Sequence, residues 1–352
     1  MPLESQTAAI LANIEAQGLP ALNELSVADA RAMMVAGIPD LPQVEVGSVE
    51  NRTIDGRPYS ADILIDGVSN TEEGASKNIP IRIYRPVVTF SANPSSANPS
   101  SANAINEDKK RPVHIYFHGG GWVLGDLDTH DRICRELCAL ADVIVVSVAY
   151  RLAPENPFPA GLQDAFAALC WVSDNLTQLG ARQDKKALSV GGDSAGATLA
   201  AGVCILARDQ GKQDLQNISF QLLCYPVADA SMSCQSYQSN GEGYLLSKKM
   251  MEWFWGYYCP QATAKAHPLA SILNASDLSN LPPTLLLTAE YDPLRDEGEQ
   301  YAERLSEAGV SVKMNRLDGL IHGFMSQVGY IPATRAGLDM AVAALKEAHS
   351  IS

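Results

Sequence analysis

The segment Ala187-Leu-Ser-Val-Gly-Gly-Asp-Ser-Ala-Gly-Ala-Thr-Leu-Ala-Ala-Gly202 decides the fold prediction for this chain of 352 residues. It predicts a short strand, a sharp turn at Gly192-Asp193-Ser194-Ala195-Gly196 and a helix of small residues. Small residues on both sides of such a turn let a serine occupy a strained position with its hydroxyl exposed. Ser194 is therefore the candidate nucleophile. A glycine-rich turn that merely lets a helix pack closely against a strand would show the same pattern.

Short apolar strands alternate with helical segments around this turn, from Pro112 onward. Unbroken runs such as Val143-Ile-Val-Val are typical of a sheet covered on both faces, and the alternation makes that sheet mostly parallel. The predicted fold class is α/β, with ligands expected beyond the carboxyl ends of the strands. The expected strands are 113–117, 143–148, 187–190, 220–224, 284–288 and 310–315. The expected helices lie near 130–141, 161–178, 195–208, 294–308 and 333–348.

The first part of the chain follows other patterns. Two short helices are expected, around Ala8–Ala16 and after the N-cap Ser26, and two strand-like runs, Ala61–Ile65 and Ile79–Tyr84, predict a meander. Residues 91–109 contain the unit Ser-Ala-Asn-Pro-Ser twice, followed by an altered third copy. Serine, asparagine and proline cannot build a core, so this segment is expected to be a low-complexity surface loop without function.

Composition argues against several classes of function. The chain has 26 Lys and Arg against 40 Asp and Glu, a formal net charge of −14, so it would repel nucleic-acid phosphates and anionic lipids. The uncharged central stretch 195–207 is shorter than the roughly 20 apolar residues of a membrane span. The first basic residue is Arg31, so the positive start of an export signal is missing. We expect a cytoplasmic protein that binds neither nucleic acid nor membrane, with seven reduced, mostly buried cysteines.

Three consecutive glycines follow the first strong strand, in His118-Gly119-Gly120-Gly121-Trp122. Glycines let backbone N–H groups turn together toward an oxyanion without steric cost. The expected donors are the amides of Gly120, Gly121 and Ala195, the residue after the nucleophile. A dinucleotide-binding fingerprint fails on spacing, because Leu124 stands where its third glycine is required. A flexible loop is the remaining alternative.

A serine hydroxyl needs a base, and three histidines follow Ser194 in the chain. His322 lies in a glycine-bounded loop just beyond the last strand, where an imidazole can reach the serine. His267 precedes a proline and has no strand before it, and His349 is expected in a frayed C-terminal tail. His322 is therefore the best candidate base, although an isolated histidine is more often a buried one satisfied by hydrogen bonds.

Asp292 is the candidate carboxylate that orients the base. It lies at the carboxyl end of the strand 284–288, whereas Asp296 and Glu297 lie in the next helical turn and are expected to point elsewhere. Aspartate before proline is also a common helix N-cap. Asp292 can orient the base and cap the helix together only if the same carboxylate is shared between the two contacts.

A group of histidines and aspartates early in the predicted sheet raises the alternative of a metal site. Its members are His114, His118, Asp126, Asp128, His130 and Asp131. The aspartates precede a helix, whose N-terminus favours carboxylates, and no His-Glu-x-x-His motif is present. We therefore expect no catalytic metal.

The sequence resembles the hormone-sensitive-lipase-like branch of the α/β-hydrolases, also called bacterial family IV, a group with many bacterial carboxylesterases. Five motifs carry the resemblance in family order: His-Gly-Gly-Gly-Trp (118–122), Tyr-Arg-Leu-Ala-Pro-Glu (150–155), Gly-Asp-Ser-Ala-Gly (192–196), Tyr-Asp-Pro-Leu-Arg-Asp-Glu (291–297) and Ile-His-Gly-Phe (321–324). The motif at 150–155 is expected to brace a loop through an Arg–Glu pair and Pro154. The Ser-Ala-Asn repeat has no place in the family pattern.

The resemblance implies an α/β-hydrolase fold, no cofactor, and two sets of site residues. The triad would be Ser194, Asp292 and His322, and the oxyanion donors would be Gly120, Gly121 and Ala195. It also implies a helical cap on a catalytic domain. The cap would comprise 1–45 and 230–262, and the catalytic domain 46–229 and 263–352.

Aromatic residues give the cap independent support. Met250–Tyr258 contains two Trp, one Phe and two Tyr in one helix-like segment between two strands. Such dense aromatics are more often core than substrate wall, although a cap helix does both. Trp122, beside the glycines, is expected to contact substrate.

Together these residues predict a serine carboxylesterase that works through an acyl-enzyme, and the resemblance implies short- to medium-chain esters as its substrates. A non-catalytic small-molecule receptor on the same fold is the rival, but it would have no need of a complete triad. Amide hydrolysis would use the same residues and differ in leaving-group protonation. The expected partner is a small ester molecule, and a homodimer is the assembly considered beside a monomer.

Overall fold

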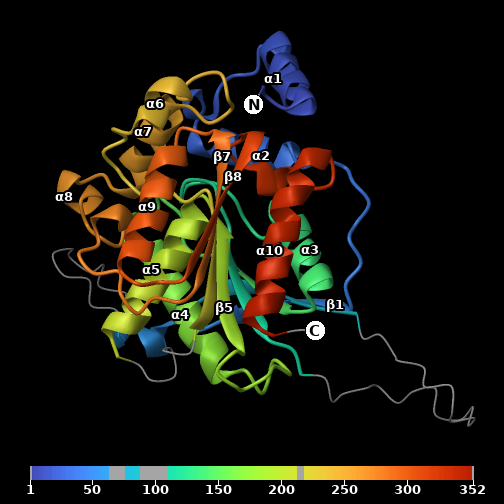
Figure 1. Ribbon diagram of the computed structural model, residues 1–352, viewed down its shortest axis with the longest axis vertical. Helices are drawn as coiled ribbons and strands as arrows, with labels where there is room; N and C mark the ends of the chain where they lie inside the picture. The colour runs from blue at the N-terminus through green and yellow to red at the C-terminus, as the bar shows by residue number, and fades with distance from the viewer. Residues whose placement is uncertain (1, 63–75, 88–109, 212–217, 351–352) are drawn as a thin grey trace, which may run out of the picture.

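The computed structural model describes residues 2–62, 76–87, 110–211 and 218–350. Within these ranges the centre is an eight-stranded sheet with helices on both faces (Figure 1). The strand order is β1-β2-β4-β3-β5-β6-β7-β8. Neighbouring strands from β4 to β8 are parallel, whereas β1 with β2 and β2 with β4 are antiparallel. The strands are β1 (Ser48–Ile54), β2 (Ile79–Arg85), β3 (Val113–Phe117), β4 (Ile144–Val148), β5 (Leu188–Asp193), β6 (Ile218–Cys224), β7 (Thr284–Tyr291) and β8 (Val312–Ile321).

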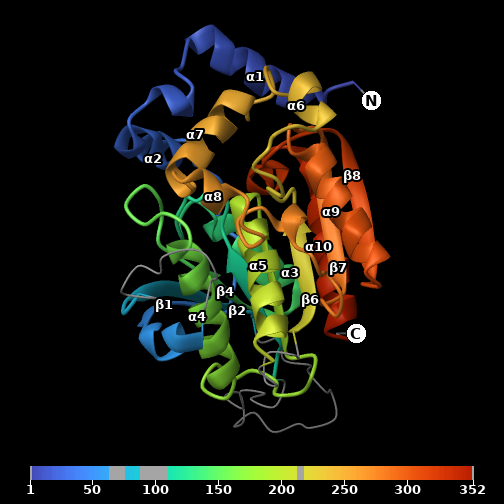
Figure 2. The same ribbon diagram turned by 90° about the vertical axis from the view of Figure 1, so that its left-hand side faces the viewer.

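Two groups of helices cover the two faces, and each encloses its own apolar core. Helices α4, α5 and α9 pack on one face, and α3 and α10 pack on the other (Figures 1 and 2). Strands β3, β4 and β5 bury every residue, because both of their faces are covered. These helices are α3 (Asp131–Ala141), α4 (Ala160–Asp174), α5 (Ala195–Asp209), α9 (Arg295–Glu307) and α10 (Arg335–Ala348). The predicted α/β class, with a mostly parallel sheet covered on both sides, is confirmed.

At one edge of the sheet β8 runs to Ile321, beyond the predicted end at 315. The other differences from the predicted strands lie near the N-terminal edge. β1 was not predicted, because this edge strand is largely exposed and its sequence lacks an apolar alternation. The strand expected at Ala61–Ile65 is wrong in its described part, since Ala61 and Asp62 end the 3-10 helix η2 (Arg57–Asp62). The remainder of that run and the predicted loop 91–109 lie outside the described residues.

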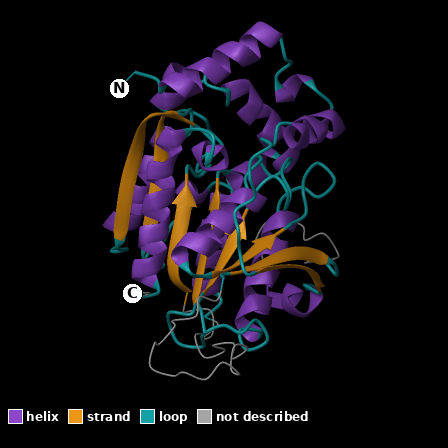
Figure 3. Ribbon diagram, turned by 90° about the vertical axis from the view of Figure 1, so that its right-hand side faces the viewer, coloured by secondary structure: helices purple, strands orange, loops and turns teal. Residues whose placement is uncertain are grey.

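Helices from two separate parts of the chain lie together beyond the carboxyl ends of the parallel strands. Figure 3 shows the arrowheads of the central strands pointing toward them, and Figures 1 and 2 show which helices they are. The N-terminal part supplies α1 (Ser5–Gln17) and α2 (Val27–Ala36), and the insertion between β6 and β7 supplies α6 (Gln235–Ser239), α7 (Lys248–Tyr258) and α8 (Ala262–Lys265). The cap boundaries given above stay a prediction. Among the described residues, no helix combines the length and apolarity that crossing a bilayer requires.

Arg31 joins α2 to the loops beneath it. Its guanidinium makes two hydrogen bonds of 2.8 Å to the carboxylate of Glu155. It also donates to the backbone carbonyls of Val123 and Ala153, both at 2.9 Å. Val123 comes shortly after the three glycines in the sequence, so this hydrogen bond connects α2 directly to the glycine loop.

The motif at 150–155 is braced differently from the expectation. Arg151 Nε binds the buried carboxylate of Asp164, on α4, at 2.8 Å, while Glu155 is bound by Arg31. The partner of Arg151 is Asp164 and the partner of Glu155 is Arg31, and these two partners lie far apart in the chain. The loop is thereby fixed to α4 on one side and to α2 on the other.

A second serine–histidine cluster lies at the opposite end of the strands. Ser189 Oγ lies 2.9 Å from both His114 Nδ1 and His349 Nε2, and all three side chains are fully buried. His114 and Ser189 are each the second residue of their strand, so the cluster lies at the amino ends, away from the expected site. The expectation of a frayed tail at His349 is therefore wrong, because this imidazole fixes the end of α10 to the sheet.

We expect Arg31→Ala to loosen the N-terminal segment. It removes four hydrogen bonds and leaves two carbonyls without that donor, a loss of about 1 kcal/mol after solvent screening of the partly exposed ion pair. Thermolysin should cleave the N-terminal segment faster than in the wild type. Arg57→Ala, which removes an exposed pair with Asp55, is the matched control and should digest at the wild-type rate. Equal digestion of Arg31→Ala and wild type would contradict the coupling.

The buried cluster predicts a loss of stability in mild acid. Burial lowers the pKa of His349 to about 4 and that of His114 to about 3. The unfolded chain takes up protons near the ordinary pKa of about 6.5, so it binds more protons than the folded chain below that pH. Stability should therefore fall as the pH decreases from about 6.5 toward 4.

Melting temperatures measured across this pH range test the assignment. His349→Gln removes one of the three buried histidines with a lowered pKa, the third being His118, so its melting temperature should fall less steeply with pH than that of the wild type. His267→Gln, at a half-buried loop histidine, is the control substitution. The cluster would not be the cause if His349→Gln kept the wild-type slope.

Candidate active site

Ser194, Asp292 and His322 meet at the carboxyl edge of the sheet. Each is the first residue after its strand, and the strands are β5, β7 and β8 respectively. Because the carboxyl ends of parallel strands share one edge, residues far apart in sequence become neighbours there. His322 Nε2 lies 3.0 Å from Ser194 Oγ, and His322 Nδ1 lies 2.7 Å from Asp292 Oδ2.

The turn at Ser194 is strained and tightly enclosed. The serine has φ 53° and ψ −122°, in a region that residues with a Cβ rarely adopt. Its N–H donates to the Cys224 carbonyl at 2.8 Å. A Cβ on either Gly192 or Gly196 would overlap the carbonyl oxygen of Phe117, so the neighbouring strand leaves room only for glycine. This packing presents the serine side chain at the sheet edge.

Asp292 uses its two carboxylate oxygens for different partners. Oδ2 contacts the imidazole of His322, and Oδ1 accepts the N–H of Leu294 at 2.8 Å. The side chain is fully buried. The carboxylate therefore contacts the base and the turn before α9, but the N-cap of α9 is Leu294, so the prediction of Asp292 as helix N-cap is wrong.

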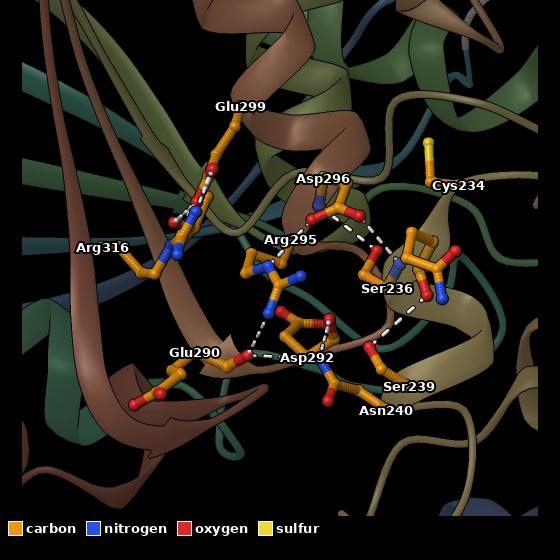
Figure 4. A network of polar contacts seen from close by, with 12 residues as sticks. Cys234, Ser236, Ser239, Asn240, Glu290, Asp292, Arg295, Asp296, Glu299 and Arg316 are labelled. Atoms are coloured by element: carbon orange, nitrogen blue, oxygen red, sulfur yellow. Dashed lines mark hydrogen bonds and ion pairs between the residues drawn. The ribbon is translucent and has the colours of Figure 1, made fainter. Parts of the chain in front are cut away.

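The insertion between β6 and β7 holds the turn that carries Asp292. Asn240, directly after α6, donates from Nδ2 to the carbonyls of Glu290 at 3.1 Å and of Asp292 at 3.2 Å (Figure 4). Arg295 Nη1 donates to the Glu290 carbonyl at 3.0 Å. Asn240 was not predicted from the sequence, since it belongs to none of the five motifs and its partners are about fifty residues away.

The glycine loop has the backbone conformation that its composition suggests. Gly120 and Gly121 have φ of 112° and 60°, and Trp122 has φ 60°. A Cβ on Gly120 would overlap the carbonyl of Leu124, to which the loop turns back. Ala195 is the first residue of α5, so its N–H has no carbonyl partner within the helix. The amides of Gly120, Gly121 and Ala195 stay the predicted oxyanion donors.

Asp193, the residue before the serine, holds the glycine loop in place. Its Oδ1 accepts the Gly119 N–H at 3.0 Å and the Tyr116 hydroxyl at 2.8 Å, and lies 3.3 Å from His130 Nε2. A Cβ on Gly119 would overlap the Asp193 carboxylate. Burial raises the pKa of Asp193, but the interactions with His130 and Tyr116 outweigh it and leave this pKa below its ordinary value. The carboxylate is thus an ionised acceptor at neutral pH.

The residues of the alternative metal site serve other contacts. Asp131 binds Arg82 at 3.1 Å and the Tyr84 hydroxyl at 2.8 Å, and Asp126 accepts two N–H groups of its own loop. His130 faces Asp193, as described above. Within the part of the chain that the structure describes, no three His, Cys, Asp or Glu side chains are arranged to hold a metal ion.

Trp122 packs beneath the aromatic helix α7. Its ring is 1% exposed and stacks on Tyr258, with centroids 4.0 Å apart and planes at 5°, and Trp255 lies 4.9 Å away. Phe254 lies against Gly121, where a Cβ would overlap its ring. The aromatics of α7 therefore form core against the glycine loop. Contact of Trp122 with substrate stays a prediction.

Comparisons with known proteins agree with this geometry. A family model described as the alpha/beta hydrolase fold matches residues 114–326. The chain is 40% identical over 274 residues to carboxylesterase NlhH of Mycobacterium tuberculosis, covering 77% of this chain and 79% of that protein. It is 37% identical over 295 residues to the ethyl acetate hydrolase of Pseudomonas putida, covering 84% and 86%. A solved structure of a thermostable esterase from Pseudomonas putida ECU1011 has a TM-score of 0.82 and 34% identity, covering 100% of this chain and 99% of that one.

Asp193→Asn should slow turnover without unfolding the chain. An amide offers one oxygen instead of two and places N–H groups near the Gly119 N–H, so the loop should shift and kcat should fall about tenfold or more. Hydrolysis of p-nitrophenyl acetate gives kcat and KM, and circular dichroism checks the fold. Asp209→Asn, at the exposed end of α5, is the matched control. An unchanged kcat in Asp193→Asn would show that this carboxylate does not hold the loop.

Proposed function

The chain belongs to the α/β-hydrolase family, in its hormone-sensitive-lipase-like branch, and we propose that Ser194, His322 and Asp292 act as its catalytic triad. It is a carboxylic ester hydrolase, in line with relatives named carboxylesterase and ethyl acetate hydrolase. One observation carries the triad assignment: a continuous line of contacts from the serine hydroxyl through the imidazole to a buried carboxylate, at 3.0 and 2.7 Å.

The geometry supports the acyl-enzyme mechanism. Ser194 Oγ attacks the ester carbonyl carbon while His322 Nε2 takes the hydroxyl proton. Asp292 holds the tautomer with a proton on Nδ1 and stabilises the imidazolium that forms. His322 then gives the proton to the departing alcohol, and in the second half it activates water to hydrolyse the acyl-enzyme.

The oxyanion of each tetrahedral intermediate would bind the three predicted amides of the glycine loop and of the first residue of α5. The positive φ angles of the two glycines and the open N-terminus of α5 support this assignment. Such donors are typically worth about a hundredfold or more in rate each.

Short- to medium-chain esters are the proposed substrates. The aromatic helix α7 packs directly on the glycine loop, with Phe254 against Gly121, which leaves little space on that side for a long acyl chain. The predicted cap, 1–45 and 230–262, would close this side of the site. A receptor without catalysis is disfavoured, because it has no use for a serine aligned with a base.

The cytoplasmic location of the enzyme stays a prediction. All seven cysteines are free, and six of them are buried. Free thiols are typical of a reducing compartment, which supports the cytoplasmic location. The homodimer considered above also stays a prediction.

Ser194→Ala should reduce the turnover of p-nitrophenyl acetate by at least about a thousandfold, since it removes the nucleophile. A fluorophosphonate should label the wild type at Ser194, identified by peptide mass spectrometry. Ser189→Ala, which alters a buried serine that also contacts a histidine, is the matched control and should keep both activity and labelling.

A panel of p-nitrophenyl esters from acetate to palmitate, together with acetyl p-nitroanilide, defines the substrate. Short and medium acyl chains should exceed palmitate in kcat/KM, and the ester should exceed the anilide. Turnover by Ser194→Ala within about tenfold of the wild type would refute the nucleophile. Preference for the anilide would identify an amide hydrolase instead.

A further inference from the structure

We propose that Tyr225 is a positioning residue for the base His322, an inference that rests on the proposed triad. Tyr225 is the first residue after β6, just as the triad members are the first residues after β5, β7 and β8. Since β6 lies between β5 and β7 in the sheet, Tyr225 occupies the one position of this row that the triad does not use. It lies outside all five sequence motifs.

The ring of Tyr225 contacts the imidazole directly. The centroids of the Tyr225 and His322 rings lie 4.7 Å apart, with the planes at 63°, a favourable edge-to-face arrangement. Phe324 packs on the same tyrosine at 4.9 Å and 74°. Tyr225 is 1% exposed, so its ring is fixed by close packing and limits how far the imidazole can swing.

Hydrogen bonds tie Tyr225 and its neighbour to the three segments that carry the triad. The Tyr225 hydroxyl accepts the N–H of Met325, in the loop of the base, at 3.2 Å. The Tyr225 N–H donates to the Leu287 carbonyl on β7 at 2.6 Å. The Cys224 carbonyl accepts the Ser194 N–H at 2.8 Å. This dipeptide therefore connects nucleophile, orienting carboxylate and base through one rigid unit.

The backbone of Tyr225 is strained. Its φ is 40°, in the left-handed region that is unfavourable for a bulky side chain. Such strain persists only where the surroundings over-determine the conformation, and it is concentrated at active sites. At Tyr225 the strained backbone turns the ring away from the line of β6 and toward the loop of His322.

Tyr225 would act on the rate of the chemical steps rather than on substrate binding. The imidazole must stay aligned first with the serine hydroxyl and then with the leaving group, and a displacement of about 1 Å can cost about a hundredfold. Burial raises the pKa of Tyr225 well above its ordinary value, so the phenol stays neutral across any assay pH. The imidazole faces the carboxylate of Asp292 and the neutral hydroxyl of Ser194.

Two substitutions separate the ring from the hydroxyl. Tyr225→Leu removes both, and we expect kcat for p-nitrophenyl acetate to fall about a hundredfold with KM within about twofold. Tyr225→Phe keeps the ring and loses the bond to Met325, so kcat should fall only about fivefold. Fluorophosphonate inactivation should slow in parallel with kcat, because it needs the same aligned base.

Tyr301→Leu is the matched control. It removes another fully buried tyrosine, on α9, which lies outside the active site. It should lose as much thermal stability as Tyr225→Leu and keep the wild-type kcat. A wild-type kcat in Tyr225→Leu, together with a similar loss of melting temperature, would overturn the proposal and leave Tyr225 as core packing.

If Tyr225→Leu does not fold, Tyr225→Phe decides. A lower kcat at an unchanged melting temperature and KM supports the proposal, and an unchanged kcat overturns it. Failure of the proposed function itself would look different: the wild type would neither hydrolyse the ester nor react with the fluorophosphonate.

Discussion

The parallel pairing of β5, β6, β7 and β8 is the constraint on which the site depends. Parallel strands end at a common edge, so the residues that follow them become neighbours however far apart they lie in the chain. Ser194, Asp292 and His322 are such residues, and no local structure could bring the imidazole within 3.0 Å of the serine and 2.7 Å of the carboxylate. Helices cover both faces of this sheet, and its central strands are wholly buried.

Close packing at this edge has a cost that the surrounding residues offset. The serine and Tyr225 are held at positive φ, and glycines are required where the loop, the turn and β3 approach one another. The buried carboxylates are not left unpaired: Asp193 is bound by a backbone N–H, a phenol and an imidazole, and Asp292 by an imidazole and a backbone N–H. Electrostatic pairing and steric fit thus operate at the same few residues.

The elements that could be predicted are those whose signal lies in a short stretch of sequence. The six strands from 113 onward and the glycine motifs follow from apolar runs and turn composition. The turn at 192–196 pointed to Ser194, and positions just after a strand pointed to His322 and Asp292. It missed β1, because an exposed edge strand carries little apolar pattern. It also missed Asn240 and Tyr225, and misjudged His349, because their roles arise from partners distant in the chain.

The contact between Phe254 and Gly121 couples two positions that lie more than a hundred residues apart. A methyl group at 121 would occupy the space that the phenylalanine ring fills, so neither position can be enlarged unless the other is reduced. Among homologues of this chain the two sites should consequently vary together, with the helix of the insertion retreating wherever the loop gains bulk. The packing of this helix is therefore restricted by the geometry of the loop beneath it.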